Sequence, residues 1–383
     1  MEINHHILWI WAKEILGFNN KKLLRLVDLS GSIEALFKTE DFSTFRFLTP
    51  KEQFLLSQKN LRSAWEVYGD CEENQIGILT LEDALYPALL KEISNPPSPL
   101  FFKGHLNSAC EKPMLTIVGT RRCDGYGEAM AKEITTALSY CGFSIVCGIA
   151  DGIDSFVCES VLRADGTPLA VLPYGLLSTK GHGTKYFRDI LKNGALISEA
   201  FPRNHAHRYA YHERNRILSG LSNGTLIIQA PKRSGALMTA NYAIEQNRDL
   251  FAVMANASAF SEGSNRLIKD GCYPVTEYAD ILQHYLPIFH EKLQEINIAQ
   301  EKVFSLQDEL TEDKLTAYKR KNRKLLTDDE RAVFDLLTTE ECTTDYLIEN
   351  AGIPMESVMQ SLTMLEFKGL AVSCPGSKFK VIL

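Results

Sequence analysis

Residues 115–127 read Leu-Thr-Ile-Val-Gly-Thr-Arg-Arg-Cys-Asp-Gly-Tyr-Gly, and this stretch decides the fold class. A short apolar run ends at Val118, Gly119 follows it directly, and Gly125 and Gly127 begin a segment with helical spacing. A buried strand that turns through glycine into a helix is typical of a Rossmann-like sheet, and the backbone N–H groups of such a turn favour phosphate. The stretch lacks the G-x-G-x-x-G spacing and the Walker lysine, which argues against NAD and ATP.

The same alternation of apolar runs and helical segments continues to about residue 285. Six runs have the continuous apolar character of buried strands, at residues 115–118, 144–147, 169–172, 195–197, 225–228 and 250–253. Between them lie segments whose apolar residues recur three and four positions apart, as in helices. We therefore expect an α/β fold with a doubly wound, mainly parallel sheet, which binds ligands at the carboxyl ends of its strands.

The segments before this sheet indicate a separate helical domain. Residues 1–75 contain short helical patterns separated by glycine, asparagine and serine, which predict an all-helical domain of SAM or helix-hairpin-helix type. Such a domain can bind DNA backbones or serve in packing and self-association, and both interpretations stay open. An irregular connector with Tyr86-Pro87 and Pro96-Pro97 then leads into the Rossmann-like domain, predicted over residues 76–288.

The last part of the chain predicts a linker and a winged helix. The charged linker covers residues 289–325 and contains a basic cluster at Lys319, Arg320, Lys321, Arg323 and Lys324. Residues 326–383 show three helical patterns and a hairpin, which together predict a winged-helix domain. Its candidate recognition helix, residues 355–368, has Lys368 as its one basic residue. A protein contact fits this helix better than duplex reading, although the upstream cluster could add nonspecific phosphate contacts.

Composition indicates a soluble protein of several domains. The chain has 383 residues, of which 45% are hydrophobic and 23% charged, and its formal net charge is −7. This acidic balance argues against a surface that coats nucleic acid indiscriminately, so DNA contact requires a local basic patch. No apolar stretch approaches the roughly 18 residues of a membrane span. Residues 1–11 are a poor signal peptide and the nine cysteines stand singly, so we expect a cytoplasmic protein with reduced thiols and without a metal site.

Positive charge gathers in two segments that the topology brings to one edge of the sheet. The first begins a helix and contains Arg214, Asn215 and Arg216, preceded by Arg203, His205, His207 and Arg208. The second follows the strand at 225–228, also begins a helix, and contains Lys232, Arg233, Ser234 and Gly235. Guanidinium groups bind phosphate bidentately, and a helix N-terminus adds free N–H groups. With Thr120, Arg121 and Arg122 of the first turn, these segments predict a phosphate-binding groove.

A second glycine-rich turn, Cys-Gly-Ile-Ala-Asp-Gly-Ile-Asp at residues 147–154, ends the next strand at the same edge. Gly148 and Gly152 let the backbone approach a ligand closely. Asp154 stands at a helix start, where an N-cap role is commoner than catalysis, and we expect the cap. For Glu199, just after the strand at 195–197, we expect structural hydrogen bonding rather than catalysis.

Five ordered motifs closely resemble the DNA processing protein A family, also called DprA or Smf. Residues 117–121 match its I-V-G-S/T-R turn, residues 148–154 match its S-G-x-A-x-G-I-D turn, and three further signatures lie at 214–222, 234–240 and 263–268. The resemblance covers residues from about 80 to 285, and both flanking domains fit a common family architecture. The chain departs from the family pattern at Cys147, Asp151 and Met254-Ala255, and Asp151 lowers the positive charge of the second turn.

The resemblance implies a protein that binds single-stranded DNA, forms a homodimer through its Rossmann-like domain, and loads RecA recombinase on incoming DNA during natural transformation. It implies no enzymatic activity, no cofactor and no membrane partner, whereas the residues themselves support only phosphate binding. The predicted DNA phosphate site has no catalytic residue and consists of Gly119, Thr120, Arg121, Arg122, Gly148, Arg214, Asn215, Arg216, Lys232, Arg233, Ser234 and Gly235.

The alternative is a nucleotide-processing enzyme related to the lysine decarboxylase-like phosphoribohydrolases. Those enzymes cleave a nucleotide on a related sheet and carry a Pro-Gly-Gly-x-Gly-Thr-x-x-Glu loop, whose glutamate is needed for the chemistry. Residues 231–239 of this chain read Pro-Lys-Arg-Ser-Gly-Ala-Leu-Met-Thr, without that glutamate. The sequence therefore favours DNA binding.

Overall fold

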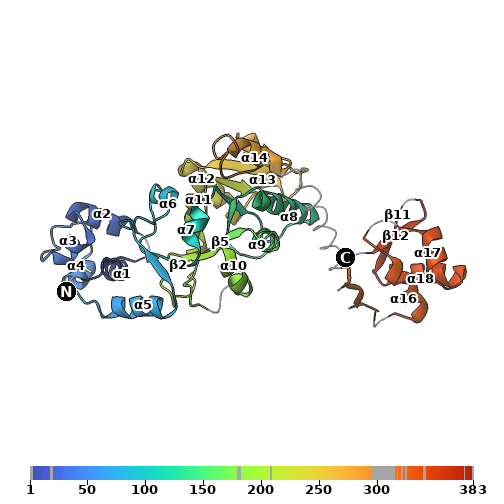
Figure 1. The fold of residues 1–383 in the computed structure, drawn as a ribbon, viewed down its shortest axis with the longest axis horizontal. Coiled ribbons are helices and arrows are strands. Elements are labelled where there is room, and N and C mark those ends of the chain that lie inside the picture. The colour runs from blue at the N-terminus through green and yellow to red at the C-terminus, as the bar shows by residue number, and fades with distance from the viewer. Residues whose placement is uncertain are drawn as a thin grey trace. The chain divides into compact units, whose positions relative to one another are not determined.

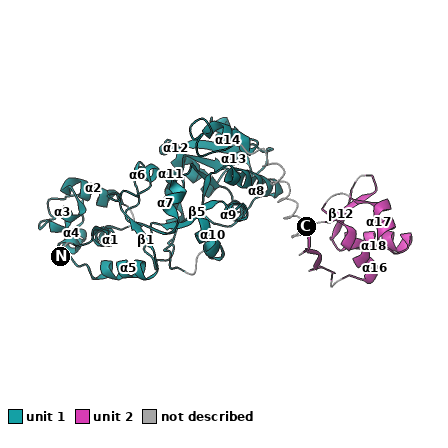
Figure 2. Cartoon of the chain, in the orientation of Figure 1, with its two compact units in different colours: residues 1–296 teal, residues 297–383 magenta. Residues whose placement is uncertain are grey.

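The computed structural model describes residues 3–17, 20–178, 183–207, 209–294, 315–316, 318–320, 322–323, 326–339, 342–374 and 376–381. The chain forms two compact units, residues 1–296 and 297–383 (Figure 2). The predicted helical and Rossmann-like domains both fall in the first unit. Arg208, Lys321 and Lys324 of the predicted basic segments lie outside the described residues. No helix in the described ranges combines the length and apolar character needed to cross a membrane.

A nine-stranded sheet forms the centre of the first unit, in the order β1-β2-β6-β5-β4-β3-β7-β8-β9 (Figure 1). The seven strands β6-β5-β4-β3-β7-β8-β9 pair parallel with one another. The pairs β1–β2 and β2–β6 are antiparallel. This confirms the predicted mainly parallel, doubly wound sheet. The strands are β1 (Gly77–Leu79), β2 (Leu100–Gly104), β3 (Met114–Val118), β4 (Ser144–Cys147), β5 (Thr167–Leu172), β6 (Ala195–Ser198), β7 (Gly224–Ile227), β8 (Asp249–Val253) and β9 (Tyr273–Val275).

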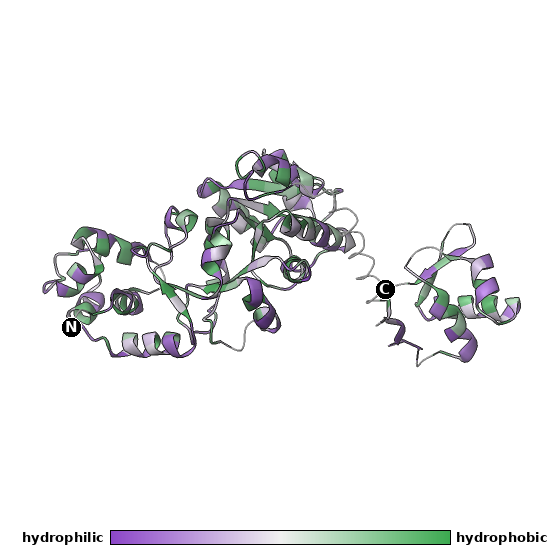
Figure 3. Ribbon diagram, viewed as in Figure 1, coloured by the Kyte–Doolittle hydropathy of each residue, from purple (hydrophilic) through white to green (hydrophobic). Residues whose placement is uncertain are grey.

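Helices cover both faces of this sheet, because alternate residues of each strand enter two different cores. Leu115 and Ile117 of β3 pack into one core with residues of α8, α9 and α14, while Met114 and Val118 pack into the other with α11 and α12. The strands are correspondingly apolar (Figure 3). The helices around the sheet are α6 (Ala88–Lys91), α7 (Leu106–Cys110), α8 (Gly125–Tyr140), α9 (Ile153–Arg163), α10 (Phe187–Asn193), α11 (Ala210–Leu221), α12 (Gly235–Glu245), α13 (Glu262–Lys269) and α14 (Tyr278–Tyr285), with a short 3₁₀ helix η1 (Thr184–Tyr186).

The chain reverses direction across the sheet at β3. It proceeds from β3 through β4 and β5 to β6, then returns to place β7 on the other side of β3. The turns that follow β3 and β7 therefore lead to helices on opposite faces and leave a crevice at the carboxyl ends of the strands. Ligands of open α/β sheets bind at such a switch point.

The connector predicted as irregular forms part of the sheet instead. Strands β1 and β2 pair with each other, and β2 pairs antiparallel with β6, with Phe101 opposite Ser198. Phe101 is fully buried, and the pairing covers an edge of β6 that would otherwise expose unpaired backbone groups. The prolines at 96, 97 and 99 precede β2 rather than interrupt it.

Five helices precede the sheet, α1 (His5–Leu16), α2 (Asn20–Ser30), α3 (Ile33–Lys38), α4 (Pro50–Ser57) and α5 (Arg62–Glu73). A buried polar cluster joins them to it. The Glu199 carboxylate accepts hydrogen bonds from Lys13 Nζ at 3.1 Å, Asn20 Nδ2 at 3.0 Å and Arg216 Nη2 at 2.6 Å. Glu199 thus has the structural role expected from its position at a strand end.

The second unit contains a winged helix. Its elements are α16 (Asp328–Leu336), β10 (Cys342–Thr343), α17 (Thr344–Asn350), α18 (Met355–Phe367), β11 (Ala371–Cys374) and β12 (Lys378–Val381). The strands form a small sheet in the order β10-β12-β11, and β11 and β12 are the wing hairpin. Phe334, Leu347, Val358 and Leu362 occupy a core within this unit. The predicted winged-helix domain is confirmed.

Candidate phosphate-binding site

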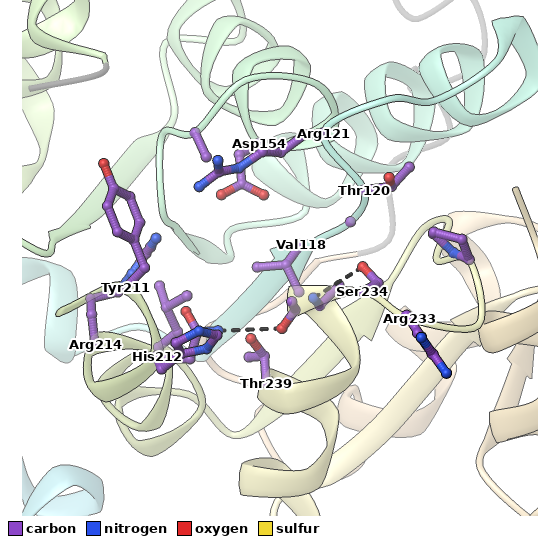
Figure 4. A pocket seen from close by; sticks show the side chains of 17 residues that line it. Val118, Thr120, Arg121, Asp154, Tyr211, His212, Arg214, Arg233, Ser234 and Thr239 are labelled. Atoms are coloured by element: carbon purple, nitrogen blue, oxygen red, sulfur yellow. Dashed lines mark hydrogen bonds between the residues drawn. The ribbon is translucent and has the colours of Figure 1, made fainter. Parts of the chain in front are cut away.

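A pocket of about 680 Å³ lies at the carboxyl end of β3, between the turn after β3 and the starts of α11 and α12. Figure 4 shows side chains from several elements around it, including Arg121 after β3, Asp154 on α9, Tyr211 on α11 and Ser234 before α12. The pocket therefore occupies the switch point of the sheet, where the sequence predicts a phosphate site.

The turn after β3 is tied to β7 and to α9 by backbone hydrogen bonds. The Thr120 N–H donates to the Gln229 carbonyl at 2.8 Å, and the Ile153 N–H donates to the Thr120 carbonyl at 3.2 Å. Gly152 has a φ of +79°, and a Cβ there would lie 2.5 Å from the Thr120 carbonyl oxygen, so only glycine fits this approach. The turn thus holds Arg121 at the pocket.

Asp154 does not cap α9, contrary to the prediction. The N-cap residue is Gly152, and Asp154 lies in the first turn of the helix, where its side chain is almost fully buried. Its carboxylate accepts hydrogen bonds from the backbone N–H groups of Ala150, Gly119 and Gly148. Burial raises the pKa of this carboxyl, and the positive charge of Arg214 opposes that shift. Asp154 therefore holds two glycine-rich turns and an arginine together.

Arg214 is the buried cation of the pocket, with an exposed fraction of 6%. Its Nη1 donates to the Val171 carbonyl at 3.2 Å, and its Nε has no hydrogen-bond partner among the described residues. Burial lowers the pKa of this guanidinium, and Asp154 opposes the effect. An anionic ligand in the pocket would stabilise this buried positive charge.

The start of α12 supplies the opposite side of the pocket. Ser234 is the N-cap, and its hydroxyl accepts a hydrogen bond from the Ala236 N–H at 3.2 Å. Asn215 on α11 donates from Nδ2 to the Gly235 carbonyl at 3.3 Å, which joins the two helix starts. The dipole and the free N–H groups of an 11-residue helix favour an anion here.

Eight of the twelve predicted residues line this pocket, namely Gly119, Thr120, Arg121, Arg214, Asn215, Arg233, Ser234 and Gly235. Gly148 lies directly behind Arg214. Arg122 and Lys232 are exposed, and Lys232 pairs with Glu262 at 3.4 Å. Arg216 is buried and donates to Glu199, so the structure does not bring it to the pocket.

Nine lining residues were not among those predicted, and Asp154, Tyr211, His212 and Thr239 are the four of them with polar side chains. The guanidinium of Arg121 lies over the Tyr211 ring, 5.3 Å from its centroid. His212 contacts the Met238 sulfur through Nδ1 at 2.9 Å. Tyr211 lies one helical turn before Arg214, so these two residues share a face of α11. That spacing is the signal that could have identified it.

The pocket presents three arginines and a helix N-terminus against one carboxylate that is already hydrogen-bonded. This arrangement fits a polyanion with aromatic groups better than a divalent cation. Among the described residues, a cluster of three side chains able to ligate a metal occurs at His5, His6 and Asp83, none of which lines the pocket.

Fold and site together define a Rossmann-like protein whose pocket has the form of a phosphate-binding turn and which lacks both the dinucleotide and the Walker signatures. Residues 77–286 match the model of the family described as DNA recombination-mediator protein A, and residues 319–377 match the DprA winged helix domain. The first match covers more than half of the 383 residues, and the chain therefore belongs to the DprA/Smf family.

Similarity to individual known proteins agrees with this assignment. Protein Smf of Synechocystis is 29% identical over 340 residues, which cover 85% of this chain and 85% of that protein. Protein Smf of Escherichia coli is 32% identical over 309 residues, covering 78% of this chain and 76% of its own length. DNA processing protein DprA of Bacillus subtilis is 32% identical over 213 residues, covering 55% of this chain and 72% of the relative.

Two solved structures share the fold. DprA from Streptococcus pneumoniae superposes with a TM-score of 0.63 at 24% identity, covering 74% of this chain and 98% of that one. A structure of DprA from Helicobacter pylori, whose subject is its single-stranded DNA binding mode, superposes with a TM-score of 0.51 at 24% identity, covering 56% and 98%.

Proposed function

We propose that this protein binds single-stranded DNA in the pocket and serves DNA processing during natural transformation in the cytoplasm. The observation that carries the proposal is Arg214, which lines the pocket with Arg121 and Arg233 between glycine-rich turns and a helix start. A phosphate diester accepts charge-assisted hydrogen bonds from guanidinium groups arranged in this way. Family membership and the printed names of the relatives support the same function.

Phosphate contacts alone do not distinguish a single strand from a duplex. Tyr211 lines the pocket beside Arg121, and an aromatic ring with a guanidinium on its face is a surface on which an unpaired base can stack. Bases of a duplex are stacked within the helix and are not available to this ring. Tyr211 therefore supports the preference for a single strand.

The protein further loads RecA recombinase on the bound strand and acts as a homodimer through its Rossmann-like domain. Strand β9 is at the end of the sheet, and its Tyr273 is 49% exposed, which supports an association face there. RecA loading should appear as earlier RecA ATP hydrolysis on single-stranded DNA that is coated with a single-strand-binding protein. Light scattering at rising concentration measures the dimer.

The pocket binds the DNA strand without catalysing a reaction on it. Asp154 is the carboxylate that lines it, and a raised pKa is a feature of catalytic acids. However, three backbone N–H groups already engage this carboxylate, which fits a structural role. The alternative, a nucleotide-processing enzyme, predicts release of base from a nucleoside monophosphate. We expect no release above the uncatalysed rate.

Fluorescence anisotropy with a labelled poly-dT strand and a matched duplex, each across a salt series, tests the proposed binding. We expect a strong preference for the single strand and an affinity that falls steeply with salt, because lysine and arginine contacts release counterions. Equal affinity for strand and duplex, or affinity independent of salt, would contradict the proposal and direct attention to the nucleotide hydrolysis assay.

A further inference from the structure

The winged-helix domain has an uneven charge distribution. Residues 326–383 contain four lysines and arginines against ten aspartates and glutamates, a formal net charge of −6. The basic cluster at 319–324 adds five positive charges before them, and over residues 319–377, which match the winged-helix family model, the formal net charge is −3. A winged helix that holds DNA must offer cations to the phosphates. The basic residues of this domain precede α16, lie on α16 or lie on β12, and the one at the end of α18 is Lys368, so helix α18 itself is poorly suited to contact with phosphates.

Helix α18, in the recognition position, exposes an apolar surface. Val358, Leu362 and Leu365 enter the core of the domain. Four large apolar side chains of the same 13-residue helix remain exposed, Met355 at 62%, Met359 at 42%, Met364 at 43% and Phe367 at 88%. Met355 and Met359 share one row on the exposed side of α18, and Met364 and Phe367 share a second row, with Glu356 and Thr363 exposed between the two rows. Single exposed apolar residues are ordinary, but two apolar rows on one helix are less so. We call these four residues the α18 surface.

Negative charge surrounds the α18 surface. Glu356 is exposed on the same helix, and α17, which packs beside it, exposes Asp345 and Glu349. The basic group at the end of α18, Lys368, donates to the Glu330 carboxylate at 2.7 and 2.8 Å. Lys378 and Lys380 lie on the wing strand β12 rather than on α18. The exposed side of α18 therefore combines two apolar rows with acidic groups beside them.

We propose that the α18 surface binds a cationic amphipathic helix of a partner protein. Methionine side chains are flexible and polarizable and suit a helix packed against them, while the carboxylates attract lysines and arginines at the rim. The exposed side of α18 from Met355 to Phe367 extends about 18 Å at 1.5 Å per residue, so a partner helix of roughly three turns can lie between its two apolar rows. A second copy of this acidic domain, like a DNA phosphate backbone, would be repelled.

The test uses the full chain and two labelled model peptides with an identical leucine face. One carries lysine on its polar face and the other carries glutamate. Anisotropy at physiological salt should show the lysine peptide binding at least about tenfold more tightly, because only it complements the acidic rim. Met359→Ala and Phe367→Ala should each weaken this binding by about tenfold, as truncation of an interface anchor does. Glu356→Lys should also weaken it.

Ile244→Ala provides the matched control, because Ile244 is 58% exposed on α12 in the other compact unit. This variant should bind the lysine peptide like the parent protein. Three results would overturn the proposal: no preference for the lysine peptide, binding insensitive to Met359→Ala and Phe367→Ala, or duplex DNA affinity lost in Phe367→Ala. A dimer that dissociates in Phe367→Ala, measured by light scattering, would replace the partner helix with a second copy and equally overturn it.

Discussion

A Cβ atom placed on Gly148 would lie 1.8 Å from Nη1 of Arg214, so the guanidinium of the buried arginine fills the space that a side chain at position 148 would need. Gly148 follows β4, and Arg214 is a buried residue near the start of α11, so two motifs that are distant in the sequence meet here. Arg214 can turn into the pocket only because position 148 has no side chain. Gly148 thus acts on the site through Arg214.

Gly148→Ala should therefore weaken single-strand binding without removing any phosphate ligand. The methyl group displaces the guanidinium, and loss of one charge-assisted hydrogen bond costs about 1.5–3 kcal/mol, or roughly 10- to 150-fold in affinity. Gly125→Ala is the control, because a Cβ there meets nothing within 4 Å. Anisotropy with poly-dT measures both variants, and equal affinities would exclude the positioning role of Gly148.

Arg121→Ala should lower both the affinity for poly-dT and its salt dependence. Arg121 is exposed at the pocket, so its removal leaves the core intact. Each phosphate contact with a single strand contributes about 0.7 to the slope of log affinity against log salt, and the slope should fall by about that amount. Arg122→Ala, an exposed neighbour outside the lining, should change the slope less. The reverse order would assign the contact to Arg122.

Tyr211→Ala and Tyr211→Phe distinguish base stacking from hydrogen bonding. Stacking of a base on an aromatic ring contributes about 1–3 kcal/mol, so the alanine variant should bind poly-dT roughly 5- to 150-fold more weakly. The phenylalanine variant keeps the ring that faces Arg121 and should bind nearly as the parent does. The affinity for a strand without bases should be the same in both variants as in the parent protein. Loss of affinity in Tyr211→Phe would instead indicate a role for the hydroxyl.

The sequence predicts the parallel sheet and most of its site because both are encoded locally. Buried strands appear as continuous apolar runs, and glycine marks the turns at which they end. Strand β2 could not be predicted in this way, since its place depends on pairing with β6, nearly a hundred residues later. Strand β9 has only three residues, two of them exposed, so it lacks an apolar run.

Side-chain direction explains the differences within the site. Arg214 and Arg216 are two positions apart on α11, which separates them by about 200° around the helix, so only one can face the pocket. The pattern does not say which one, because the choice depends on how α11 packs against the sheet. The prediction that Asp154 caps α9 is wrong for a related reason. Its hydrogen-bond donors include Gly119, which precedes it by 35 residues and is brought near by the fold.

Glu199→Gln should destabilise the protein more than it affects DNA binding. Lys13 and Arg216 are buried, and both donate to this carboxylate. Loss of the negative charge leaves two buried cations without their counterion, which costs about 3–5 kcal/mol. Thermal unfolding measures this loss. Glu66→Gln is the control, since Glu66 pairs with Arg62 at 3.4 Å between exposed side chains and should change stability by less than about 1 kcal/mol.

The loss of folding stability in Glu199→Gln should become smaller as pH rises. Burial lowers the pKa of Lys13, and removal of Glu199 removes the main interaction that raises it. The unfolded chain then binds a proton that the folded chain lacks over the interval from the lowered folded pKa up to about 10.4, so stability increases with pH there. Lys13→Met combined with Glu199→Gln should abolish this pH dependence and recover part of the stability. A pH-independent deficit would show that Lys13 stays protonated in the folded variant, with another group compensating its charge.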